Sequence, residues 1–163
     1  MSIDPRWEEV REDGLPDNGL REIIFPDAYA EAGGVENAEW QKLVDWIRSC
    51  SDWTVSYAEG GDAVEMPGDV AEIMERSPTV STLWRIDIGR GVIVNTYFAP
   101  GEIEFDVDPR EVRGQTEFAL VCDFVRSIGA LARRRVEVSA EGSNGPVIMS
   151  FDPATGEFTQ STP

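Results

Sequence analysis

Three consecutive segments of this chain have the composition of β-strands, two of them with alternating apolar and polar residues, and only short turns separate them. The segments cover residues 80–88, 92–98 and 102–108, with turns at Gly89-Arg90-Gly91 and Ala99-Pro100-Gly101. Successive side chains of a β-strand point to opposite faces, so the first and third segments have the two-residue period of a strand that buries one face. The mostly apolar residues 92–98 return between them as a second strand. Turns this short join antiparallel neighbours. The sequence therefore predicts a three-stranded antiparallel meander.

Two longer segments have the three- and four-residue spacing of apolar side chains that is typical of an amphipathic helix. The first covers residues 37–50, with Asn37 as a possible cap, and the second covers residues 116–132. A shorter helix is expected at residues 69–76, because Pro78 ends it. Each long helix has one apolar stripe, so we expect both to cover the meander.

Further strands are expected on both sides of these elements. Residues 53–57 alternate as a short strand, and residues 136–140 and 147–151 form a hairpin around Gly142-Ser143-Asn144-Gly145. A last short strand is expected around Phe158. The predicted fold class is therefore α+β: an antiparallel sheet, made of a three-strand meander and a C-terminal hairpin, covered by two main helices.

The length of 163 residues fits one domain with a hydrophobic core of its own. Proline and glycine interrupt residues 1–35, which we expect to form an irregular N-terminal wrap with a short strand at Glu22–Phe25. Residues 36–163 then form the α+β core. The sequence shows neither an internal repeat nor a linker, so the prediction is a single domain over residues 1–163.

The charge of the chain limits its partners. It has 31 acidic and 14 basic residues, no histidine and a formal net charge of −17. Nucleic acids and anionic membranes are bound through clustered Lys and Arg, so direct binding to either is not expected. The sequence has no long apolar run or export signal, and Cys50 and Cys122 lie among apolar residues. We therefore expect a cytoplasmic protein with two buried thiols.

No complete catalytic motif is present. Without histidine there is no Ser-His-Asp or Cys-His arrangement and no histidine ligand for zinc, and no glycine-rich nucleotide loop occurs. Same-face carboxylates on one strand lie about 7 Å apart, too far for two neighbours to hold one metal ion without help. We predict no enzyme activity, no cofactor and no metal, with a small carboxylate enzyme as a remote alternative.

The alternating segment at residues 102–108 places four carboxylates on one face of a strand and three apolar residues on the other. One interpretation is a solvated face that protects a sheet edge. The other is a recognition face for a basic protein. A row of like charges destabilises the fold, which indicates that the row is kept for a function. The candidate partner-binding residues are Glu102, Glu104, Asp106 and Asp108, with Asp87 at the rim and Trp46 as an exposed anchor.

Three arginines, Arg133, Arg134 and Arg135, follow the helix predicted at residues 116–132. Cations at the C-terminal end of a helix interact favourably with its dipole, which is the simpler interpretation. An anion site is the alternative.

The order of elements from Ser81 to Phe158 is similar to that of small immunity proteins from bacterial polymorphic toxin systems. The resemblance rests on the acidic strand, the following helix, the hairpin and the closing segment Phe151-Asp152-Pro153-Ala154-Thr155-Gly156-Glu157-Phe158. It implies a cytosolic α+β protein that binds and blocks a cognate toxin domain, commonly with an acidic face against the basic cleft of a nuclease or deaminase. No motif matches position by position, so the resemblance assigns no role to any residue.

Two other functions fit the charge. A nucleic-acid mimic would place its carboxylates where a DNA-binding protein expects phosphates. A non-catalytic accessory or scaffold domain would use its charge for solubility alone.

Overall fold

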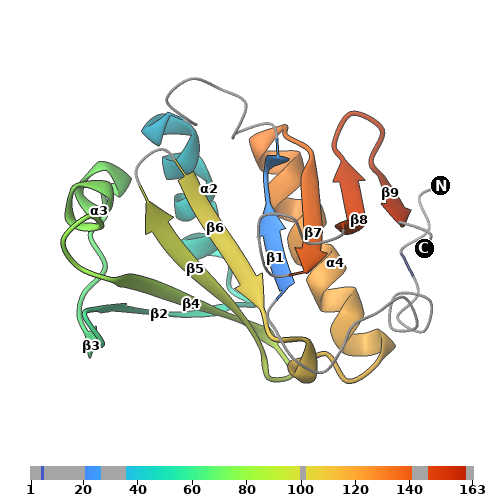
Figure 1. The fold of residues 1–163 in the computed structure, drawn as a ribbon, viewed down its shortest axis with the longest axis horizontal. Coiled ribbons are helices and arrows are strands. Elements are labelled where there is room, and N and C mark those ends of the chain that lie inside the picture. Colours follow the sequence, from blue (N-terminus) through green and yellow to red (C-terminus); the bar gives the residue numbers. More distant parts are fainter. Residues whose placement is uncertain (1–4, 6–20, 27–35, 100–101, 141–146, 161–163) are drawn as a thin grey trace.

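The computed structural model describes residues 5, 21–26, 36–99, 102–140 and 147–160 of the chain. Within these residues the chain forms one nine-stranded sheet in which every neighbouring pair of strands is antiparallel (Figure 1). The strands are β1 Arg21–Ile24, β2 Thr54–Glu59, β3 Asp62–Ala63, β4 Thr82–Gly89, β5 Val92–Ala99, β6 Glu102–Val107, β7 Val136–Ala140, β8 Val147–Asp152 and β9 Glu157–Gln160. Their order across the sheet is β3-β2-β4-β5-β6-β1-β7-β8-β9.

The predicted meander and hairpin are both confirmed, but they belong to one continuous sheet. Strands β4, β5 and β6 form the meander, β7 and β8 form the hairpin, and β9 adds the expected short strand beside β8. The strand expected at Glu22–Phe25 is present as β1. It lies between β6 and β7 and pairs with both. The N-terminal part of the chain therefore supplies the strand that joins the two halves of the sheet.

The helices also match the predicted segments closely. They are α2 Asn37–Ser49, α3 Val70–Arg76 and α4 Gln115–Ala132, with a short 3-10 helix, η2, at Pro109–Glu111. The residue before α2 is Glu36, so Asn37 is the first helical residue and not the expected cap. Asp69 does cap α3, because its carboxylate accepts a hydrogen bond from the backbone N–H of Ala71 at 2.9 Å.

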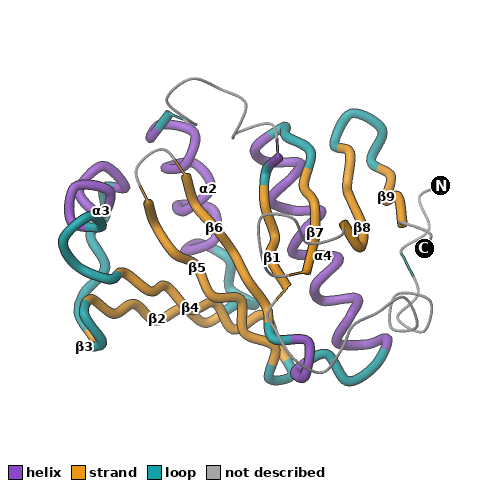
Figure 2. The backbone as a smooth tube through the Cα atoms, viewed as in Figure 1, coloured by secondary structure: helices purple, strands orange, loops and turns teal. Residues whose placement is uncertain are grey.

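Helices α2 and α4 lie behind the strands in Figures 1 and 2, and α3 lies at the left beside α2. Phe124 of α4 lies edge-on to Phe105 of β6, with ring centroids 5.4 Å apart. The backbone N–H of Val70 in α3 donates to Gln41 of α2 at 2.7 Å, which holds the two helices together. The core between helices and sheet is one cluster whose largest fully buried side chains include Trp40, Trp84, Phe105, Phe124 and Phe151.

Helix α4 lies unusually close to the strands near its C-terminal end. A methyl group on Gly129 would lie 2.7 Å from a ring carbon of Phe151 in β8 and 3.0 Å from Val136 in β7. Atoms at these distances overlap, so only glycine allows this approach. Cys122 of the same helix is fully buried, as expected, whereas Cys50 after α2 is only half-buried.

Candidate functional site

The face of the sheet opposite the helices carries a row of polar residues that crosses six strands. We call this face the open face and the row the polar row. Each member lies directly opposite the next on the neighbouring strand, at the distance over which cross-strand pairs interact. In order across the sheet the row is Ser56 (β2), Arg85 (β4), Asn95 (β5), Asp106 (β6), Glu22 (β1) and Ser139 (β7).

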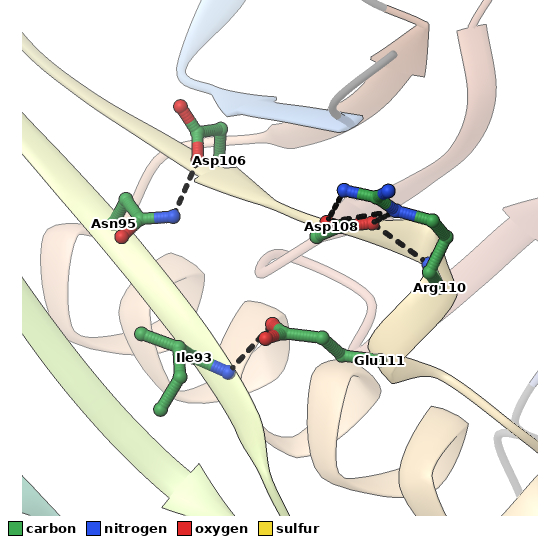
Figure 3. Close-up of polar contacts among 6 residues, drawn as sticks. All are labelled: Ile93, Asn95, Asp106, Asp108, Arg110 and Glu111. Carbon is green, nitrogen blue, oxygen red and sulfur yellow. Dashed lines mark hydrogen bonds and ion pairs between the residues drawn. The ribbon is translucent and has the colours of Figure 1, made fainter. Parts of the chain in front are cut away.

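Asp106 lies in the middle of the polar row and is largely buried. Only 7% of its surface is exposed, and its Oδ1 accepts a hydrogen bond from Nδ2 of Asn95 at 3.0 Å (Figure 3). The alternating sequence of β6 would be the same in an edge strand and in a central strand, so it does not predict the burial of Asp106. Because β6 is central, Asn95 and Glu22 flank Asp106 from both sides. Asp106 is therefore part of the polar framework of the sheet and not a freely exposed charge.

Two neighbouring carboxylates, Glu22 and Asp106, face each other across β1 and β6. Like charges directly opposite each other in a sheet are destabilising unless other groups compensate them. Both side chains take part in interactions within the molecule. The sheet thus keeps two opposed carboxylates at its centre, one of which, Asp106, accepts the hydrogen bond from Asn95.

The other acidic residues of the predicted face occupy different environments. Glu102 begins β6, but its side chain lies outside the described residues. Glu104 is half-buried on the open face, opposite Tyr97. Asp108 follows the strand and pairs with Arg110, whose Nη2 lies 2.6 Å from Oδ2 (Figure 3). The Arg110 guanidinium lowers the pKa of Asp108, which also accepts from the backbone N–H of Arg110. Asp108 therefore serves the start of η2.

The two outlying candidates have structural partners. Oδ1 of Asp87 accepts a hydrogen bond from the backbone N–H of Gly89 at 2.9 Å and so stabilises the turn between β4 and β5.

Trp46 of α2 is not the exposed anchor that its position off the helix stripe indicated. It is partly buried and packs edge-on to Trp53, with ring centroids 5.3 Å apart. Trp53 in turn packs on Phe124 of α4. Trp46 therefore belongs to the helix layer, on the opposite side of the sheet from the polar row.

The structure brings two residues to the open face that the sequence reasoning missed. Tyr97 of β5 is 40% exposed and lies opposite Glu104. Arg85 of β4 is exposed and, among the described residues, has neither a hydrogen bond nor an ion pair. Partial burial and then the negative charge of Asp106 raise the pKa of Tyr97, while the charge of Arg85 opposes that rise. One signal was available in the sequence, since Tyr97 lies two residues after Asn95 and therefore on the same face of the strand.

Most other charged groups hold elements of the fold together. Glu59 of β2 accepts hydrogen bonds from the hydroxyl of Tyr57 and from Nη1 of Arg76 in α3, each at 2.9 Å. The bond from Arg76 lowers the pKa of Glu59, while burial raises that of Tyr57. Glu117, in the first turn of α4, pairs with Arg90 in the β4–β5 turn at 3.1 Å. Its pKa is lowered by a hydrogen bond from its own backbone N–H and then by Arg90.

No group of three or more Asp, Glu or Cys side chains in the described part of the chain is arranged to hold a metal ion. Within the same residues, none of the helices combines the length and apolar composition that crossing a bilayer requires.

Comparison with protein-family models, with curated proteins and with solved structures gives no match to this chain. The similarity to immunity proteins therefore stays an expectation from the sequence.

Proposed function

We propose that this protein binds and neutralises a basic protein partner through the open face of its sheet, as the immunity proteins of toxin systems do. The observation that carries the proposal is the exposed pair Arg85 and Tyr97, which lies beside the polar row on a face that no described helix covers.

The composition of the open face fits a protein interface. Antiparallel sheets with helices on one side often leave the other side accessible. Tyr and Arg are the residue types that most often dominate the energetics of interfaces, because they combine a large contact area with directed hydrogen bonds. Tyr97 and Arg85 lie on adjacent strands, with half-buried Leu83 beside them in β4. This group replaces Trp46 as the proposed anchor.

The net charge favours a basic partner. A charge of −17 on 163 residues creates a negative potential around the molecule, which speeds the approach of positively charged proteins. Glu22, Glu104 and Asp106 contribute to this potential at the open face even though they have internal interactions. A toxin domain that acts on nucleic acid needs a positive cleft, so it is the type of partner that this surface fits.

A pull-down tests the proposal. The tagged protein is incubated with native cytosol at low salt after nuclease treatment, and bound proteins are eluted with a salt step and identified by mass spectrometry. We expect one dominant basic protein, because shape at the anchors selects a single partner. Its activity should be blocked when the two proteins are mixed.

Other results would overturn the proposal. Capture of many DNA-binding proteins, each displaced by added duplex DNA, would indicate a nucleic-acid mimic. An eluate without a basic protein would indicate an accessory domain whose charge serves solubility.

A further inference from the structure

Beyond partner binding, we propose that a groove at the C-terminal end of α4 binds a small oxyanion, carried by a phosphate or carboxylate group, through Arg133 and Arg135. The groove has a volume of about 860 Å³, and its Arg135 immediately precedes β7, which carries Ser139 of the polar row near its other end. It is lined by Glu39 of α2, by the β8–β9 turn and by the three consecutive arginines.

Two of the three arginines have carboxylate partners. Nη2 of Arg134 lies 3.2 Å from Oε2 of Glu39, and this pair joins the end of α4 to the first turn of α2. Nη2 of Arg135 lies 3.1 Å from Oε1 of Glu137. A guanidinium has five N–H donors, so Arg135 keeps donors that can face the groove. Its side chain is 50% exposed.

Arg133 has no such partner. It is exposed, and among the described residues its side chain has neither a hydrogen bond nor an ion pair. Its guanidinium therefore keeps all its donors for a ligand. Helix-dipole compensation alone does not require three arginines, since one cation near the last turn supplies it.

The backbone of Arg133 adds an independent observation. Its φ of 55° and ψ of 38° are in the left-handed region, where glycine is the usual residue after a helix. A side chain in this conformation costs free energy, and such strained residues concentrate at functional sites. The chain thus keeps an arginine that lines the groove at a position where glycine would carry no such strain.

The surroundings limit the size of the ligand. Glu39 and Asp152 line the same groove, and the whole protein repels anions. A nucleic acid or another polyanion would meet this repulsion along its length. A compact anion with two oxygens on one side matches the fork of donors on a guanidinium and avoids most of the repulsion.

The test is an NMR titration of the full-length protein with sodium phosphate and, separately, with sodium acetate at constant ionic strength. We expect saturable shifts in the backbone signals of Arg133–Arg135 and Ala154. Tighter binding of phosphate would identify a phosphate ligand, and tighter binding of acetate a carboxylate ligand. Absence of saturable shifts with both anions would overturn the proposal.

The variant Arg133→Gly separates binding from folding. It removes the guanidinium and relieves the left-handed conformation, so the protein should melt at the same temperature as the wild type or higher. Loss of one charged hydrogen-bonding group should weaken anion binding about tenfold or more. Arg113→Gln, just before the N-terminal end of α4 and so at the other end of that helix, removes the same charge and should leave anion binding unchanged. Wild-type affinity in Arg133→Gly would contradict the assignment.

Discussion

Asn95 of β5 donates a hydrogen bond to the buried carboxylate of Asp106 in β6, with 3.0 Å between Nδ2 and Oδ1. This contact couples two central strands through their side chains as well as through the backbone ladder. It also fixes an amide and a carboxylate in the centre of the face that we propose for partner binding. The polar row is thus both a structural element and part of that surface.

Replacement of Asn95 by alanine should destabilise the fold. The carboxylate of Asp106, only 7% exposed, would lose one donor, and a hydrogen bond to a charged group contributes about 1.5–3 kcal/mol. The free energy of unfolding, measured by urea denaturation, should fall by that amount. Ser56→Ala at the exposed end of the polar row should change it by less than about 0.5 kcal/mol. Equal stabilities for both variants would show that the Asn95 hydrogen bond is not needed.

Gly129→Ala should destabilise the protein although alanine is the better helix former. The propensity gain is about 1 kcal/mol, while overpacking in a dense core costs about 1–3 kcal/mol. The new methyl group would lie 2.7 Å from Phe151, so the steric cost should prevail. A matched control is Ala130→Gly at the next, exposed position, where propensity alone operates and costs about 1 kcal/mol. A higher melting temperature for Gly129→Ala would contradict the close packing of α4 on β8.

The ion pair between Glu117 and Arg90 predicts a pH dependence of stability. The pKa of Glu117 is lower in the folded state, so its ionised form stabilises the fold above the unfolded-state pKa of about 4.3. This contribution is lost as the pH falls through the lower, folded-state pKa. Glu117→Gln should therefore reduce the free energy of unfolding at pH 7 and flatten its decline below about pH 4.

The control for this prediction is Glu75→Gln, which removes an exposed carboxylate of α3 that has no hydrogen bond to a described residue. The difference between the two pH curves isolates the contribution of Glu117. Superimposable curves would refute the proposed role of this pair.

The elements of this fold could be predicted from the sequence because each has a clear local period. The alternation in β4 and β6 defined strands, and the spacing of Trp40, Leu43 and Ile47 defined α2 within one residue of its observed end. The spacing of apolar residues depends only on which side chains lie on one face of the segment. It can therefore be recognised without knowing which elements pack against that segment.

The position of each element in the fold could not be predicted in the same way. The period of β6 is the same for an edge strand and a central strand, so Asp106 could not be recognised as buried. Insertion of β1 between β6 and β7 is a pairing between residues more than 80 positions apart, with no local signal. Likewise, Trp46 lies off the stripe of α2, but Trp53 packs against it from the following segment. The burial of Asp106, the insertion of β1 and the packing of Trp46 all depend on contacts between segments and not on the segments themselves.

The binding of a partner by the open face is tested most directly by comparing Tyr97→Ala with Leu131→Ala in the pull-down. Tyr97 is 40% exposed on the open face, and Leu131 is 38% exposed on α4, on the helix side of the sheet. Neither truncation removes a fully buried side chain, so both variants should fold. We predict that Tyr97→Ala loses most of the captured basic partner while Leu131→Ala retains it. Full capture by Tyr97→Ala, with loss in Leu131→Ala, would contradict the account and place the interface on the helices.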